Sequence, residues 1–227
     1  MRDKIDSLSI AVPESAMAVT VFYNLIALLV IIDPVGISAI FVGLTRGLPD
    51  AERRWTAVRG VFIAGIVLLV FAFLGEFLLR ALGITLPALK IAGGVLLFLL
   101  ATDMVFARQT GLRSMTAAED REAESKSDIS VFPLAIPLIA GPGAMTSVVL
   151  LMSRLQGDPI GQAVFIMVLM VALGLTLAAL LFASRMVSLL GITGTNVVSR
   201  TLGIVLAALA VQFLVDGTME SFGLARP

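Results

Sequence analysis

Two short groups of polar and helix-breaking residues interrupt apolar stretches of this chain and could together hold a polar solute. The first group is Asp33, Pro34, Gly36 and Ser38, and the second is Gly141, Pro142, Gly143 and Thr146. A helix that restarts after such a break presents unpaired N–H groups at the positive end of its dipole, which favours an anionic group such as an amino-acid carboxylate. These eight residues are therefore the predicted substrate-binding site.

Asp33 is the most unusual of them, because a carboxylate in the middle of a membrane span costs on the order of 3 kcal/mol. It must be solvated, paired or protonated there, so Asp33 is the candidate for proton coupling or for holding a substrate ammonium group. The alternative role is structural, since the side chain could cap the following helix by accepting hydrogen bonds from amides near Gly36. A structural reading also applies to both breaks, because Pro and Gly often kink membrane helices for packing alone.

The elements that carry these groups are predicted to be membrane spans. The chain is 59% hydrophobic and 14% charged, with a mean hydropathy of +1.05, so a soluble core of ordinary composition could not bury its apolar surface. A spanning helix needs about 20 mostly apolar residues. Six such runs are present: Ala16–Leu44, Ala57–Leu79, Ala88–Phe106, Val131–Met152, Ile160–Phe182 and Val197–Phe222. The predicted fold is an all-α membrane protein of six transmembrane helices, with the first and fourth spans broken at mid-membrane.

The residue types that are absent narrow the chemistry. The chain has no Cys and no His, so disulfides, thiolate metal sites and a Ser–His pair are excluded. The formal net charge is zero, which does not suggest nucleic-acid binding. No catalytic residue, metal or cofactor is predicted, and no nucleotide-binding loop is present. The expected partners are the lipid bilayer and a small-molecule substrate.

The two halves of the chain resemble each other at an offset of 108 residues. This offset aligns Leu82–Thr85 with Leu190–Thr193, which share the sequence Leu-Gly-Ile-Thr, and Pro34 with Pro142. The alternative is chance similarity between apolar helices. Each half holds three spans, so a true repeat would enter the membrane upside down, as in many secondary transporters. The predicted units are a first three-helix repeat at 1–106, a polar connecting loop at 107–130 and a second three-helix repeat at 131–227.

Basic residues predict the orientation. Ten of the sixteen lie in the connections after the first, third and fifth spans, and the other six lie in the termini and the remaining connections. Connections rich in Lys and Arg stay in the cytoplasm. Both termini are therefore predicted to be periplasmic, in a protein of the bacterial inner membrane.

Several motifs, in order, resemble the MarC family of integral membrane proteins. They are Asp33–Gly36 through Leu44–Thr45, Leu89–Gly94, Pro133–Pro137, Ala140–Gly143, and Ser199–Arg200 with Gly203. The resemblance implies a six-helix inner-membrane protein of the LysE-type transporter superfamily, some of whose members transport small neutral amino acids. Two positions depart from the family pattern: Asp33 stands where Asn is usual, and Ala39 where a second proline is frequent.

The leading hypothesis is a secondary transporter of small neutral amino acids, such as alanine or glycine, with Asp33 as the group for proton coupling. A non-transporting regulatory or scaffold protein is the alternative. An intramembrane enzyme is disfavoured, because a carboxylate dyad needs two acidic residues at mid-depth. Glycines and alanines on the third and sixth spans would suit either a homo-oligomer or contacts within one bundle.

Overall fold

The computed structural model describes residues 14–106 and 128–224, and each regular element in these ranges is helical. The elements are α1 (Glu14–Ile32), α2 (Pro34–Leu44), α3 (Asp50–Ala81), α4 (Leu86–Phe106), η1 (Ser130–Ile139), α6 (Pro142–Ser153), α7 (Pro159–Leu181) and α8 (Ala183–Ser221). Within these ranges, five helical stretches are long and apolar enough to cross a membrane. The number rises to six if the bent pair of η1 and α6 counts as one span.

Each predicted span corresponds to one of these stretches, although several ends differ. α3 begins at Asp50 rather than Ala57, because its polar first turn continues the helix beyond the apolar run. α8 begins at Ala183, and its membrane-crossing part is Thr193–Ser221. Ser130, the last residue of the predicted loop, belongs to η1, whereas residues 107–127 lie outside the described part.

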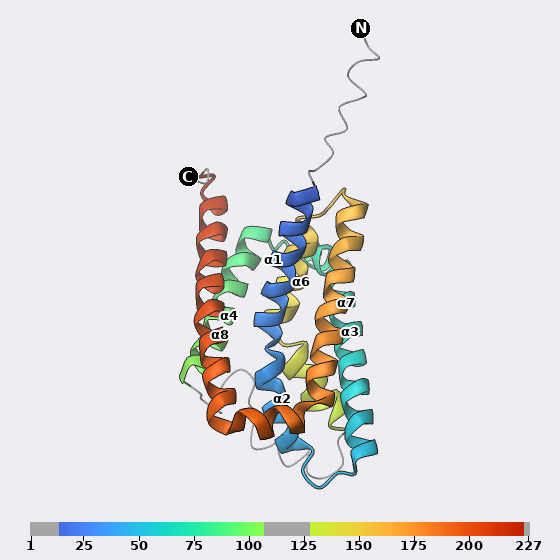
Figure 1. Ribbon diagram of the computed structural model, residues 1–227. Helices are drawn as coiled ribbons and strands as arrows, with labels where there is room; N and C mark the ends of the chain where they lie inside the picture. Colours follow the sequence, from blue (N-terminus) through green and yellow to red (C-terminus); the bar gives the residue numbers. More distant parts are fainter. Residues whose placement is uncertain (1–13, 107–127, 225–227) are drawn as a thin grey trace.

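The interrupted segments occupy the middle of the bundle (Figure 1). α4 packs along α8 on one side, and α3 packs with α7 on the other. α1 and α2 lie against α7 and α8, whereas η1 and α6 lie against α3 and α4. Each interrupted segment therefore packs mainly on helices from the other half of the chain.

Glycines set the close approach of α4 and α8. A Cβ atom at Gly94 would lie 2.9 Å from the carbonyl oxygen of Ala210, and one at Gly217 would lie 2.9 Å from that of Pro87. A Cβ at Gly203 would lie 2.9 Å from the Cβ of Met104. Small residues allow helix backbones to approach closely in membranes. Many of the small residues on α4 and α8 therefore form contacts within one chain.

Large apolar side chains face outward over the long helices. Phe62 and Phe77 on α3 are 67% and 74% exposed, and α7 and α8 also carry exposed methionines, leucines and valines. In water such a surface would aggregate, whereas in a bilayer it meets acyl chains. The buried core is likewise apolar, and it is contributed largely by the interrupted segments, with Leu28, Ile37 and Leu134 fully buried.

The shared Leu-Gly-Ile-Thr sequence has the same backbone feature in both halves. Gly83 has φ of 69° and Gly191 has φ of 65°, in the left-handed region that glycine adopts without strain. Gly83 turns the chain between α3 and α4, whereas Gly191 bends α8. The first part of α8 therefore lies across the end of the bundle before the helix turns along its length (Figure 1).

Candidate functional site

Asp33 forms the interruption between α1 and α2. Among the described residues it is the non-glycine residue with a positive φ, 54°, and it is only 1% exposed. Pro34 starts α2, and proline disfavours helical geometry at the residue before it, so the helix stops at Ile32 and restarts. The Gly36 N–H donates to Asp33 Oδ1 at 3.0 Å. The structural role considered for Asp33, a helix cap, is therefore present.

Gly36 has no side chain, which leaves space for the Asp33 carboxylate that caps α2. A Cβ atom at this position would collide with the Asp33 carboxylate and would lie 3.1 Å from the Ser199 hydroxyl oxygen of α8. Asp33 and Ser199, from the two halves of the chain, thus approach the same point. Sequence reasoning did not assign Ser199 to the site, since nothing local in the sequence places the middle of α8 beside the start of α2.

The second interruption separates η1 from α6. Phe132 and Ile136, which precede Pro133 and Pro137, have extended backbone angles, so η1 is irregular at these two points. After Ile139 the chain bends by 58° before α6 begins. The helical backbone is thus irregular at the predicted prolines and glycines in both places, although α1 and α2 together still form one apolar stretch, Ala18–Leu44, that is long enough to cross a membrane.

The amino-terminal end of α6 differs from that of α2 because no side chain caps it. The first backbone hydrogen bond into α6 runs from the Met145 N–H to the Gly141 oxygen, at 2.9 Å. The N–H groups of Gly143 and Ala144 precede that bond, and neither donates to the chain before the helix. Two buried donors at the positive end of a helix dipole are thus available to an acceptor.

The two predicted hydroxyls behave alike. The Ser38 hydroxyl donates to the Pro34 oxygen at 2.7 Å, and the Thr146 hydroxyl donates to the Pro142 oxygen at 2.8 Å. Each proline is the first residue of its helix. Since each hydroxyl proton is already used, Ser38 and Thr146 retain only their lone pairs, which could accept a hydrogen bond from a substrate ammonium group.

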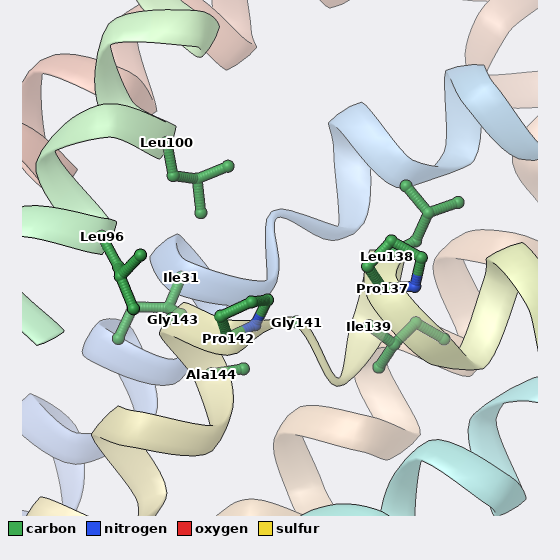
Figure 2. Close-up of a pocket in the computed structure, with 10 residues that line it drawn as sticks. All are labelled: Ile31, Leu96, Leu100, Pro137, Leu138, Ile139, Gly141, Pro142, Gly143 and Ala144. Atoms are coloured by element: carbon green, nitrogen blue, oxygen red, sulfur yellow. The ribbon is translucent and has the colours of Figure 1, made fainter. Parts of the chain in front are cut away.

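A small cavity opens at the second interruption (Figure 2). Its lining residues come from α1, α4, η1 and α6: Ile31, Leu96, Leu100, Pro137, Leu138, Ile139, Gly141, Pro142, Gly143 and Ala144. About 20 Å³ is open to the centres of water molecules, which is room for one or two waters. Three predicted site residues, Gly141, Pro142 and Gly143, line this cavity. The other five do not.

Ile31 links the two interruptions, because it lies two residues before Asp33 and lines the cavity at the start of α6. The cavity walls are otherwise branched apolar side chains, with the α6 amino end as the polar element. Such a site suits a ligand with a carboxylate and a small apolar side chain.

Other charged groups form structural pairs near the ends of the helices. Lys90 of α4, 6% exposed, is paired with Glu220 of α8, and Arg154 lies 3.6 Å from Asp216 of α8. At the start of η1 the hydrogen bond from the Ser130 hydroxyl lowers the pKa of the Asp128 carboxyl, burial acts in the opposite direction, and Arg59 lowers that pKa further. Within the described ranges, no cluster of three or more acidic residues could hold a metal ion.

The described residues form only helical elements, and five or six of their stretches are long and apolar enough to cross a membrane, so the chain is a multi-pass integral membrane protein. The family model described as "MarC family integral membrane protein" matches residues 18–222, so the chain belongs to the MarC family. This confirms the resemblance drawn from the sequence motifs.

Relatives from archaea and bacteria match most of the chain. A UPF0056 membrane protein of Methanocaldococcus jannaschii is 37% identical, over 82% of this chain and 90% of its own length. The UPF0056 membrane protein YvbG of Bacillus subtilis is 33% identical, over 87% and 93%. The UPF0056 inner membrane protein YhgN of Escherichia coli is 35% identical, over 85% and 92%. No solved structure matches.

Proposed function

We propose that this protein is a secondary transporter of small neutral amino acids across the inner membrane, with the substrate bound between the two helix interruptions. The observation that carries the proposal is the uncapped amino-terminal end of α6, whose residues Gly143 and Ala144 line a cavity that Ile31 of α1 also lines. A substrate carboxylate would accept hydrogen bonds from these amides, in a place where the helix dipole favours negative charge.

The same cavity would restrict the size and the charge of the substrate. Leu96, Leu100 and Leu138 close its walls, which would favour a hydrogen atom or a methyl group over a longer side chain. None of its lining residues carries a charge, so a charged side chain on the substrate would be desolvated without a partner. Glycine and alanine are the ligands that satisfy both conditions.

We propose that the two halves form an inverted repeat, with both interruptions near the middle of the membrane. α1 and α2 run along the bundle in the direction opposite to η1 and α6 (Figure 1). The matched hydrogen bonds of Ser38 and Thr146 and the matched φ angles of Gly83 and Gly191 support the correspondence between halves. Irregular backbone at membrane depth is tolerated where it is enclosed by protein, as it is around Asp33 and Ala140.

Asp33 is the proposed coupling group. It is buried, it is titratable, and its carboxylate lies beside Ser199 of the opposite half. Neutralising this charge would change the interaction between α2 and α8, which pack against each other. A proton or a substrate ammonium group at Asp33 could therefore bias the relative positions of the two halves.

Transport requires a state other than the one described. The cavity holds only one or two waters, so an amino acid needs the surrounding helices to separate. The breaks at Asp33 and at Ala140–Gly141 are the proposed hinges, since the helical hydrogen bonding is already interrupted there.

Uptake of labelled alanine and glycine into liposomes containing the purified protein, with and without a pH gradient, tests the proposal. We expect a pH gradient to increase substrate accumulation by the unaltered protein. In Asp33→Asn we expect accumulation that no longer depends on the gradient. Absence of uptake of either amino acid under all gradients would refute transport. Unchanged gradient dependence in Asp33→Asn would refute the coupling role alone.

A matched pair of variants tests the carboxylate site. Ala144→Pro removes one N–H donor in the first turn, where proline is tolerated, whereas Ala144→Ser keeps that donor. A hydrogen bond to a charged group contributes about 1.5–3 kcal/mol, so the proline variant should weaken substrate binding roughly tenfold to a hundredfold more than the serine variant. Equal affinities of the two variants would exclude the α6 amides from binding.

A further inference from the structure

The connections from α2 to α3 and from α7 to α8 lie at the same end of the bundle (Figure 1). A second cavity is lined by residues on either side of these connections. It offers about 270 Å³ to the centres of water molecules, far more than the cavity at the interruptions. Arg53, Arg54 and Asp50 come from the first turn of α3, and Ser184 and Arg185 come from the first turn of α8. This cavity takes no part in the proposed amino-acid site.

The lining carries an excess of positive charge. Asp50 neutralises Arg53 through an ion pair of 2.7 Å. Arg54 and Arg185 form no ion pair with any residue that the structure describes. Two guanidinium groups from different helices therefore border one cavity, and a guanidinium matches the geometry of a phosphate through paired hydrogen bonds.

Backbone groups add to this preference for an anion. No side chain caps α8, and its first backbone hydrogen bond runs from the Met186 N–H to the Phe182 oxygen. The N–H groups of Ser184 and Arg185 precede that bond and are directed toward the start of the helix. The arginines and the helix end thus favour negative charge at the same place.

Exposed aromatic side chains beside the cavity indicate that it lies at the level of the lipid headgroups. Trp55, adjacent to Arg54, is 65% exposed, and Phe182 at the other wall is 55% exposed. Aromatic side chains gather at membrane–water interfaces. The distribution of basic residues predicts that this end is cytoplasmic, and the cytoplasmic leaflet carries the anionic lipids.

We propose that this cavity binds the phosphate of an anionic phospholipid headgroup, held by Arg54, Arg185 and Ser184. The lipid would join the start of α3 to the junction of α7 and α8, which belong to different halves. It would also contact Phe41 at the end of α2, the helix that follows the Asp33 interruption. Lipid binding at this cavity would be independent of the identity of any transported solute.

Native mass spectrometry of the full chain in neutral detergent tests this site, with phosphatidylglycerol and phosphatidylcholine as the probe lipids. Two arginines near a lipid surface predict a preference for phosphatidylglycerol on the order of tenfold. The double variant Arg54→Gln/Arg185→Gln should lose most of this preference. Arg46→Gln is the matched control, because Arg46 lies near the same end of the bundle, is exposed and does not line the cavity. It should keep the preference.

Three results would overturn the proposal. The first is an equal affinity of the unaltered protein for both lipids, and the second is an equal loss of preference in Arg46→Gln, which would indicate diffuse surface charge. The third is displacement of bound phosphatidylglycerol by inorganic phosphate at comparable concentration, which would indicate a soluble anion as the occupant. If the double variant does not fold, the two single variants replace it, and each should lose part of the preference.

Discussion

Replacing Asp33 separates its role as a helix cap from its role as a charged group. Asp33→Ala removes the hydrogen bond from the Gly36 N–H, a loss of about 1 kcal/mol for an N-cap. It also places alanine at a φ of 54°, where left-handed geometry costs about 1–2 kcal/mol. Together these changes lower the free energy of unfolding by about 2–3 kcal/mol, or roughly 5–10 °C in Tm for a chain of this length.

The matched control is Asp158, which caps α7 in the same way. The Gly161 N–H donates to Asp158 Oδ1 at 3.0 Å, the distance found at Asp33, but Asp158 is exposed and its φ is −116°. Asp158→Ala should therefore cost only the cap, about 1 kcal/mol or roughly 2–4 °C. The difference between the two alanine variants isolates the cost of the left-handed backbone.

Asparagine variants complete the comparison. Asn accepts the same hydrogen bond and tolerates left-handed geometry, so Asp33→Asn and Asp158→Asn should both retain a Tm close to that of the unaltered protein. Thermal unfolding of the purified protein in one detergent measures all four variants. Equal losses in Asp33→Ala and Asp158→Ala would refute the strain argument. A large loss in Asp33→Asn would show that the charge, rather than the cap, stabilises this interruption.

Three further predictions use the same unfolding assay. Gly93→Ala should lower the Tm by several degrees because its Cβ would overlap the Thr146 side chain, whereas Gly174→Ala, with nothing within 4 Å, should leave it unchanged or raise it slightly. Ser147→Ala should be neutral or stabilising, since the buried Ser147 hydroxyl has no hydrogen-bond partner among the described residues. Asp128 has a lowered pKa, so its stabilising contribution is present above the unfolded value, about pH 4, and is lost as the pH falls through the folded value. Asp128→Asn should therefore flatten the acid side of the stability profile, and an unchanged slope would contradict this.

Much of the fold could be predicted because the determining signals are local. Apolar runs of about 20 residues locate spans, and Pro34 and Pro142 locate the restarts of α2 and α6. The start of α3 at Asp50 could not be found this way, because a polar helical turn outside the membrane looks like a connection to a hydropathy scan. The bend of α8 at Gly191 was also missed, since glycine is common in unbent membrane helices.

The site was predicted only in part, because side-chain direction depends on backbone angles that spacing does not reveal. Gly141 and Gly143 line the cavity at the start of α6, whereas Ser38 and Thr146 turn their hydroxyls back to the preceding helical turn. Contacts between segments that are distant in the sequence could not be predicted, for a different reason. Nothing in the sequence near Leu96 indicates that it meets the start of α6, since that contact arises from the packing of the whole bundle.

The two interruptions differ in one respect that bears on the proposed mechanism. α2 carries its own anionic cap, Asp33, whereas Gly141 at the equivalent position of α6 has no side chain to offer. If the halves are an inverted repeat, one helix end is satisfied by the protein and the other is left for a ligand. Only one substrate carboxylate would then be bound per chain, at α6, while the Asp33 carboxyl group caps α2. An Asp at position 141 would satisfy the second helix end, so Gly141→Asp should prevent substrate binding more severely than Gly141→Ala, which adds the same Cβ beside the Pro137 oxygen without a carboxylate.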